Sequence, residues 1–325
     1  MTIETLLEIT QGSLTNSVNS QEIYSVSVQL NRVDEGDLFI SDIQEDILTA
    51  IDKKAGAIIY SGDIEIQNKT IVLIKVASIK DAALKLLKYI NQDRDISFSY
   101  LSSHESTFFK MIVKEKRSIE FIPDDWKKAF EKVLNSNKKI FIGEDKDLIQ
   151  AIAPKVIVLK NEESGYVIED TLFRTTFRMG KYVYQGVPIP PFHVDHILKV
   201  VAFCEKFDFP YSMDKIQRSK HFIPIFTKAE PTVHNMGRDD KIVIICDNKQ
   251  DITEAKFYVK TQGRIIAKTL ALTPPKTKID DFENPIYYRN INDIIDVIEQ
   301  SNFNYLFIYT KDSSIIEEVK KYLYR

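Results

Sequence analysis

The chain has 325 residues, of which 44% are apolar and 28% are charged. This composition is typical of a globular protein with two or three domains, and it excludes a disordered or fibrous chain. Its 44 Lys and Arg residues against 47 Asp and Glu residues leave a net charge of -3, which offers no basic field to hold a nucleic-acid backbone.

The cysteines and the N-terminus bear on redox chemistry and location. Cys204 and Cys246 lie far apart in apolar surroundings, so we expect two buried thiols and no disulfide or metal motif. The first residues are acidic where a signal peptide requires basic ones, and no apolar run approaches ~20 residues. We therefore expect a cytoplasmic protein without a transmembrane segment.

Residues 1–92 are predicted to form a small α/β domain. Alternating or apolar runs predict strands at 24–28, 38–40, 57–60 and 71–74. Residues 79–90 have the periodicity of an amphipathic helix, and the polar segment 91–95 is predicted to be a linker.

From residue 96 onward strands and helices alternate, which is typical of parallel βαβ units. The predicted elements of residues 93–224 are a strand near 96–101 with a helix after it, a strand at 118–122, a helix at 123–135, strands at 139–143 and 156–159, a hairpin turning at Met179-Gly180, a helix from His193 to about Phe207 and a second helix starting at Ser212. The last section has predicted strands at 241–246, 264–272 and 305–309 and helices at 251–259, 292–300 and 313–322.

The turn after the strand near 96–101 reads Ser102-Ser103-His104-Glu105-Ser106-Thr107 and stands where a nucleotide-binding α/β domain keeps its phosphate loop. Such a loop needs glycines for close backbone approach, a Lys for the phosphates and a hydroxyl for Mg²⁺. Here only Ser106 and Thr107 meet these needs, and Glu105 would repel a triphosphate. The helix start either binds an anion without hydrolysis or is simply capped by its Ser and Thr residues.

Four segments in this order resemble the Mur ligases, which add amino acids or dipeptides to UDP-N-acetylmuramate in peptidoglycan synthesis. The last of them, residues 306–319, is similar to the family's late strand-to-helix passage. Residues 26–40 include Gly36-Asp37-Leu38-Phe39, which resembles the G-D-L-F of the family's first domain. Residues 101–112 stand at the family's phosphate loop, and residues 192–198 stand at its H-N-V-x-N segment. The order and spacing are most similar to the branch that adds D-alanyl-D-alanine.

The resemblance implies an α/β fold of three domains, with a mostly parallel central sheet flanked by helices and a Rossmann-like C-terminal domain. The domains would be a UDP-substrate-type domain at 1–92, a degenerate ATPase-type domain at 93–224 and the C-terminal domain at 225–325. It also implies that Asn31 and Arg32 bind the substrate. The degenerate phosphate loop would consist of Ser102, Ser103, His104, Ser106 and Thr107.

The departures from the family pattern indicate a changed function. Around Ser103, His104 and Glu105 the family's glycines and lysine are missing, and its metal-binding residues have no counterpart that can be placed. We expect a homologue that has lost ATP-dependent ligation and serves as a binding or scaffolding protein in peptidoglycan metabolism. Its partner would be a peptidoglycan-synthesis protein or a muramyl nucleotide, with no cofactor, metal or catalytic residue. The alternative is an active amide ligase that uses ATP and Mg²⁺ with an atypical phosphate loop.

His193 and His196 stand three residues apart at a predicted helix start, with Asp195 between them. This spacing suits two metal-binding nitrogens. Because the sequence reveals no clear third ligand, a pair of histidines in the cap region of a helix is the simpler interpretation.

Two further groups are candidates for binding. Asp247 and Asp251 follow a predicted strand, where carboxylates face the ligand crevice of a parallel sheet or cap the next helix. Lys228 and Arg238 precede the last section, where they either contact an anionic ligand or are ordinary surface charges.

Overall fold

The computed structural model describes residues 1–16, 23–64, 66, 70–158, 165–226, 241–262, 267–280, 282 and 284–324. The chain divides into two compact units. The first unit combines Met1–Ser102 with Lys116–Val158, and the second combines Ser103–Glu115 with Leu159–Arg325. The predicted domain boundaries after residues 92 and 224 do not coincide with this division and stay predictions.

The first unit begins with a sheet in the order β1-β5-β4-β3-β2. Its strands are β1 (Ser13–Leu14), β2 (Val26–Ser27), β3 (Leu38–Ile40), β4 (Ala57–Tyr60) and β5 (Val72–Lys75). All neighbours are parallel except β1, which pairs antiparallel with β5. Helices α1 (Ile3–Thr10) and α3 (Ile79–Ile90) cover one face and α2 (Gln44–Asp52) covers the other, because successive strand side chains point alternately to the two faces.

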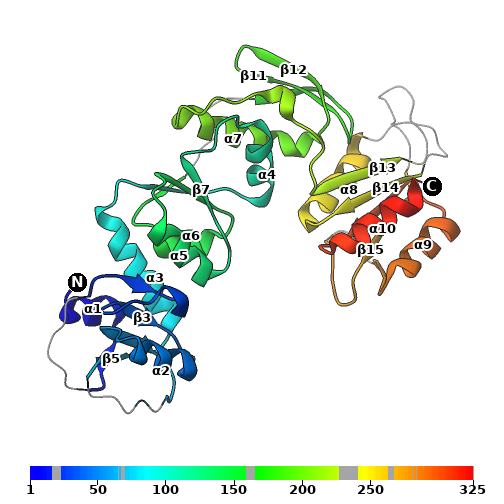
Figure 1. Ribbon diagram of the computed structural model, residues 1–325. Coiled ribbons are helices and arrows are strands. Elements are labelled where there is room, and N and C mark those ends of the chain that lie inside the picture. The colour runs from blue at the N-terminus through cyan, green and yellow to red at the C-terminus, as the bar shows by residue number, and fades with distance from the viewer. Residues whose placement is uncertain are drawn as a thin grey trace. The chain divides into compact units, whose positions relative to one another are not determined.

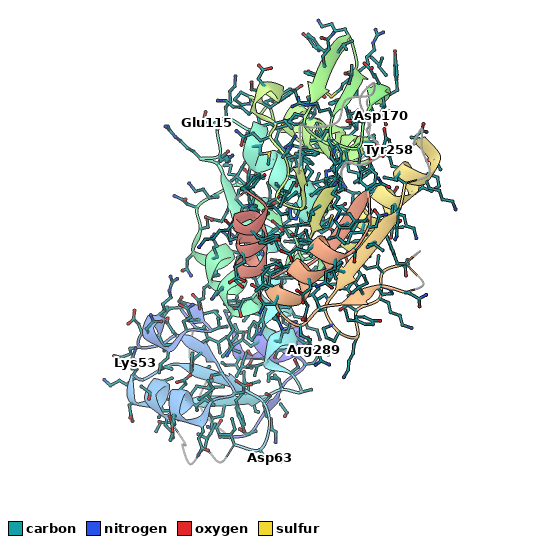
Figure 2. The ribbon with its side chains drawn as sticks, turned by 90° about the vertical axis from the view of Figure 1, so that its right-hand side faces the viewer. Lys53, Asp63, Glu115, Asp170, Tyr258 and Arg289 are labelled. Atoms are coloured by element: carbon teal, nitrogen blue, oxygen red, sulfur yellow. The ribbon has the colours of Figure 1, made fainter. Side chains whose placement is uncertain are left out.

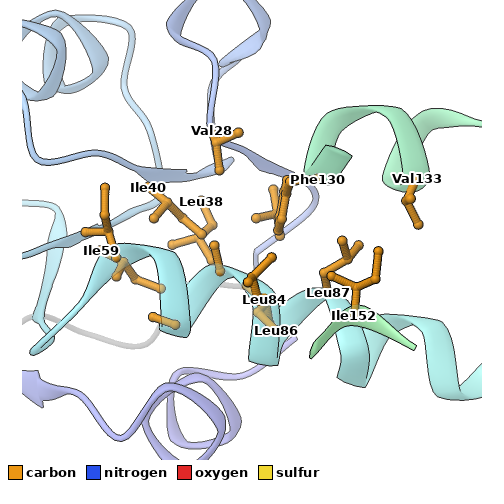
Figure 3. Packing of buried hydrophobic residues seen from close by; sticks show 14 of the residues in the cluster. Val28, Leu38, Ile40, Ile59, Leu84, Leu86, Leu87, Phe130, Val133 and Ile152 are labelled. Carbon is orange, nitrogen blue, oxygen red and sulfur yellow. The ribbon is translucent and has the colours of Figure 1, made fainter. Parts of the chain in front are cut away.

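A second, fully parallel sheet of the first unit has the order β7-β8-β6-β9. Its strands are β6 (Ser97–Tyr100), β7 (Ile119–Ile122), β8 (Ile140–Gly143) and β9 (Val156–Ile157), and its helices are α5 (Trp126–Asn135) and α6 (Lys146–Ile152). One apolar core joins the two sheets of this unit. Figure 3 shows Leu87 of α3 facing Val133 of α5 and Ile152 of α6.

The second unit contains an antiparallel sheet of β10 (Gly165–Asp170), β11 (Thr175–Met179) and β12 (Tyr182–Val187). The predicted hairpin at Met179-Gly180 is confirmed, and Gly180 takes the left-handed conformation with φ of 54°. Next to this sheet, α4 (Ser103–Ile112) packs against α7 (Val194–Lys206). A side-chain hydrogen bond between Asp170 of β10 and Tyr258 links the sheet to the C-terminal part of the unit (Figure 2).

The C-terminal part is the predicted Rossmann-like layer, with strand order β13-β14-β17-β15-β16. Its strands are β13 (Phe222–Phe226), β14 (Ile242–Cys246), β15 (Thr269–Thr273), β16 (Ile286–Tyr287) and β17 (Tyr305–Tyr309), and its helices are α8 (Lys249–Gln262), α9 (Ile291–Gln300) and α10 (Ser313–Leu323). Only β13 runs antiparallel to its neighbour. Helix α8 covers one face, and α9 and α10 cover the other (Figure 1). The α/β fold with mostly parallel sheets is therefore confirmed.

The structure corrects one predicted helix. The segment after Ser212 forms only a short 3-10 turn, Met213–Lys215, and the backbone is extended again at Ile216. Both Met213 and Ile216 are buried, so packing of the two side chains fixes the segment more strongly than its helical pattern does. Among the described residues, no helix combines the length and apolar character that a membrane span requires.

The shared core of the first unit can be tested on one helix. Leu87 is fully buried between α3, α5 and α6, whereas Tyr89 on the same helix is 41% exposed. We expect Leu87→Ala to lower the free energy of unfolding by about 2–5 kcal/mol through the lost contacts and the cavity left behind. Tyr89→Ala, the matched control, should change it by less than about 1 kcal/mol. Urea unfolding followed by circular dichroism measures both, and equal losses would contradict the assignment of Leu87 to the core.

The two thiols give a second prediction. Cys204 and Cys246 are both buried and unpaired. Burial raises the pKa of Cys204 to about 12 and also raises that of Cys246, so neither thiol forms a reactive thiolate near neutral pH. We expect no reaction with Ellman's reagent in the native protein and full reaction of both thiols in guanidinium. Fast labelling of the native chain would show that one of the thiols is accessible.

Candidate functional site

Four of the five histidines of the chain come together in the second unit. His104 lies in the first turn of α4, His193 and His196 lie at the start of α7, and His221 directly precedes β13. The ring centroid of His104 is 4.8 Å from that of His193, 4.9 Å from that of His196 and 4.6 Å from that of His221. We call these four residues the histidine cluster. The fifth, His234, lies outside the described residues.

Asp251 joins two members of the cluster. It lies in the first turn of α8, and its side chain is 5% exposed. His104 Nε2 donates to Asp251 Oδ2 at 2.7 Å, and His193 Nε2 lies 3.3 Å from Asp251 Oδ1. The carboxylate therefore turns one oxygen to each ring.

The two sides of the His193–Asp251 contact respond differently to burial. Burial raises the pKa of Asp251, but the hydrogen bonds from His104 and His193 outweigh it and hold that pKa at about 2. Burial also lowers the pKa of His193 to about 4, although Asp251 acts in the opposite direction. At neutral pH the carboxylate is charged and the His193 ring is neutral.

His221 links the first turn of α4 to the end of β14. Its Nδ1 donates to Asp247, with distances of 2.9 and 2.8 Å to the two carboxylate oxygens. Its Nε2 lies 2.8 Å from Thr107 Oγ1 and 3.2 Å from the carbonyl oxygen of Ser103. The order hydroxyl, imidazole, carboxylate is that of a hydrolase triad, but Thr107 is only 8% exposed and lies within a helix. Here the chain of hydrogen bonds fastens α4 in place.

Glu105 faces α7. Its carboxylate Oε1 lies 3.1 Å from Lys199 Nζ and 3.4 Å from His196 Nδ1, and its side chain is 6% exposed. A buried carboxylate needs such partners because desolvation of a charge is costly. The Lys199 ammonium group is thus already engaged by the protein.

The predicted phosphate-loop residues therefore contact protein groups. His104, Ser106 and Thr107 are buried, and the carbonyl oxygen of Ser103 faces His221. Ser102, the last residue of the segment Met1–Ser102, belongs to the first unit. The Ser106 hydroxyl has no hydrogen-bond partner among the described residues.

The structure bears differently on the predicted roles of the other candidate residues after residue 190. His193 occupies the N-cap position of α7 without a capping hydrogen bond from its side chain. Capping of α8 by Asp247 or Asp251 is wrong, because the Asn248 side chain accepts from the Gln250 backbone and both aspartates face histidines. Lys228 and Arg238 lie outside the described residues.

Sequence reasoning missed His221 and the role of Asp251 as a common partner. The only available signal was the small number of histidines in the chain, because the partners of Asp251 lie 147 and 58 residues away.

Arg32, a predicted substrate-binding residue of the first unit, contacts Glu131 of α5. Its Nη1 lies 3.3 Å from Glu131 Oε2. The other oxygen, Oε1, accepts from Ser27 Oγ and from the backbone N–H of Val28, both at 2.7 Å. Asn31 is exposed. The Glu131 carboxylate therefore binds Arg32 and the polar groups that lie near it in the chain.

A pocket of about 460 Å³ also lies in the first unit. Tyr24, Gly36 and Lys54 belong to its lining, whereas Asn31 and Arg32 do not occur among the described residues that line it. The predicted substrate residues and this pocket are therefore separate features.

Comparison with solved structures identifies the fold. MurF from Acinetobacter baumannii aligns with a TM-score of 0.53 at 11% sequence identity, over 100% of this chain and 99% of that chain. The MurF ligase from Thermotoga maritima, solved in complex with ADP, aligns with a TM-score of 0.54 at 11% identity, over 92% of this chain and 98% of that chain. Scans against protein-family models and curated proteins found no match. The chain has the Mur ligase-like fold that its sequence predicts.

The contacts of Glu131 lead to a stability prediction. Glu131→Ala leaves the Val28 N–H without its acceptor, so we expect a loss of about 1–3 kcal/mol in the free energy of unfolding. Arg32 is 49% exposed, and Arg32→Ala should cost less than about 1 kcal/mol because solvent screens the pair. Urea unfolding of both variants tests this, and a larger loss for Arg32→Ala would contradict it.

Proposed function

We propose that this chain is a Mur-ligase homologue that no longer ligates and that serves as a binding or scaffolding protein in peptidoglycan metabolism. The observation that carries the proposal is the first turn of α4, where the resemblance places the phosphate loop. The side chains of this turn are bound by His221, Asp251 and Lys199 of the same unit.

Electrostatics at this turn do not fit ATP with Mg²⁺. Glu105 and Asp251 are buried carboxylates close to the helix start, and Asp247 is half-buried beside them. At an effective dielectric near 20, a carboxylate about 4 Å from a phosphate charge costs about 4 kcal/mol. The nearby Lys199 ammonium group is already paired with Glu105. The turn therefore repels a polyphosphate.

The shape of the turn also disfavours binding of ATP. No glycine occurs between Ser102 and Thr107, so side chains stand where a phosphate loop brings bare backbone N–H groups to the ligand. The Thr107 hydroxyl, the group suited to Mg²⁺, is hydrogen-bonded to His221. Binding of a nucleotide here would have to break this contact.

A binding role is supported by the surface of the three-stranded sheet. Its outer strands expose large apolar side chains on one face: Tyr166 of β10 and Val183 of β12, which both pair with Arg178 of β11, are 55% and 47% exposed. Exposed apolar groups gathered on one small sheet are typical of protein contact surfaces. We assign this sheet to the contact with a peptidoglycan-synthesis protein, and the alternative partner is a muramyl nucleotide.

The loss of ligation has a direct test. Purified protein is incubated with ATP, Mg²⁺, a UDP-muramyl tripeptide and D-alanyl-D-alanine, and inorganic phosphate is measured. We expect no phosphate above the protein-free control and no calorimetric signal on titration with ATP and Mg²⁺. The MurF ligase from Thermotoga maritima serves as the positive control under the same conditions.

Phosphate release that needs both the muramyl nucleotide and the dipeptide would establish the alternative, an active ligase with an atypical phosphate loop. In that case Glu105→Gln should change the rate, because the carboxylate would lie beside the reacting phosphates. A calorimetric titration with the UDP-muramyl tripeptide alone tests the binding role separately from catalysis.

A further inference from the structure

We propose that His104, His193 and Asp251 bind a single zinc ion. One candidate ligand atom from each residue lies within 4.8 Å of the others. All three side chains are at most 5% exposed. This arrangement unites three potential ligands that come from α4, from the start of α7 and from α8.

The donor set fits zinc. Two imidazole nitrogens and one carboxylate oxygen are common zinc ligands, whereas Mg²⁺ prefers oxygen atoms and water. Ligand atoms bound at about 2.0–2.2 Å in a tetrahedral site lie about 3.3 Å apart. His193 Nε2 and Asp251 Oδ1 already have this separation, at 3.3 Å. His104 Nε2 is closer to Asp251 Oδ2, at 2.7 Å, so a small side-chain shift would admit the ion.

The other two histidines of the cluster, His196 and His221, contact other protein groups. His196 Nδ1 faces Glu105, and both nitrogens of His221 have partners in Asp247 and Thr107. They surround the proposed site without joining it. Three protein ligands leave the fourth position of a tetrahedral ion to a water molecule.

The ion would act as a cross-link. Asp251 lies 147 residues from His104 and 58 residues from His193, so one ion would hold together segments that are remote along the chain. By joining α4, the start of α7 and α8, the ion would stabilise the folded chain. This inference does not depend on whether the chain binds nucleotides.

The test uses the full chain, purified without a histidine tag and treated with a chelator. Zinc is added, the excess is removed and the bound metal is counted by mass spectrometry. Cobalt is added in parallel, because tetrahedral Co²⁺ absorbs visible light. We expect a single tightly held ion per chain, a tetrahedral cobalt spectrum and a higher melting temperature with metal than without.

Variants then assign the ligands. His104→Gln and Asp251→Asn should weaken zinc binding by at least about tenfold and abolish the cobalt spectrum. His196→Gln, a matched change in the same cluster, should retain both. Circular dichroism checks that each variant is folded. If His104→Gln does not fold, Asp251→Asn is compared with His196→Gln in its place.

The proposal is overturned if the native chain takes up no stoichiometric zinc and gives no tetrahedral cobalt spectrum. It is equally overturned if folded His104→Gln and His196→Gln bind zinc with the same affinity. In either case the three residues form a hydrogen-bonded contact without metal.

Discussion

Buried carboxylates at the first turn of α4, with their hydrogen-bond and ion-pair partners, link helices α4, α7 and α8 of the second unit. Asp251 is ionised in the interior, and a buried carboxylate is tolerated only when polar partners replace its water. His104 and His193 provide these partners, while Glu105 relies in the same way on Lys199. If α4 moved, Glu105 of α4 would lose Lys199 and Asp251 of α8 would lose His104. The positions of α4, α7 and α8 are therefore fixed together.

The apolar and polar positions of α4 obey different constraints. Phe108, Phe109 and Ile112 are fully buried and keep the packing of α4 on α7. The polar positions beside them contact the protein's own side chains. The first unit repeats this arrangement, since Glu131 holds Arg32 and the Val28 N–H. In both units a carboxylate of the chain contacts residues that the resemblance assigns to ligand binding.

The sequence predicted the elements of this fold because their signals are local. The spacing of apolar residues predicts helix α4. The Met179-Gly180 pair predicts the hairpin turn, where Gly180 takes a left-handed conformation that most residues avoid. The site lacked such signals. The sequence around His193 shows no clear third ligand, because the side chains that approach His193, Asp251 and His104, lie on other elements. Contacts across 58 or 147 residues leave no periodic trace in a single sequence.

Helix α4 also sets an order of events during synthesis. It lies between β6 and β7 along the chain, although those strands belong to the first unit and α4 belongs to the second. The partner of His104, Asp251, is made 147 residues later. At a translation rate of about 5–20 residues per second, Asp251 is made roughly seven to thirty seconds after His104 of α4. During that interval the apolar side of α4 lacks α7 and α8, so α4 reaches its buried position only after these later segments are made.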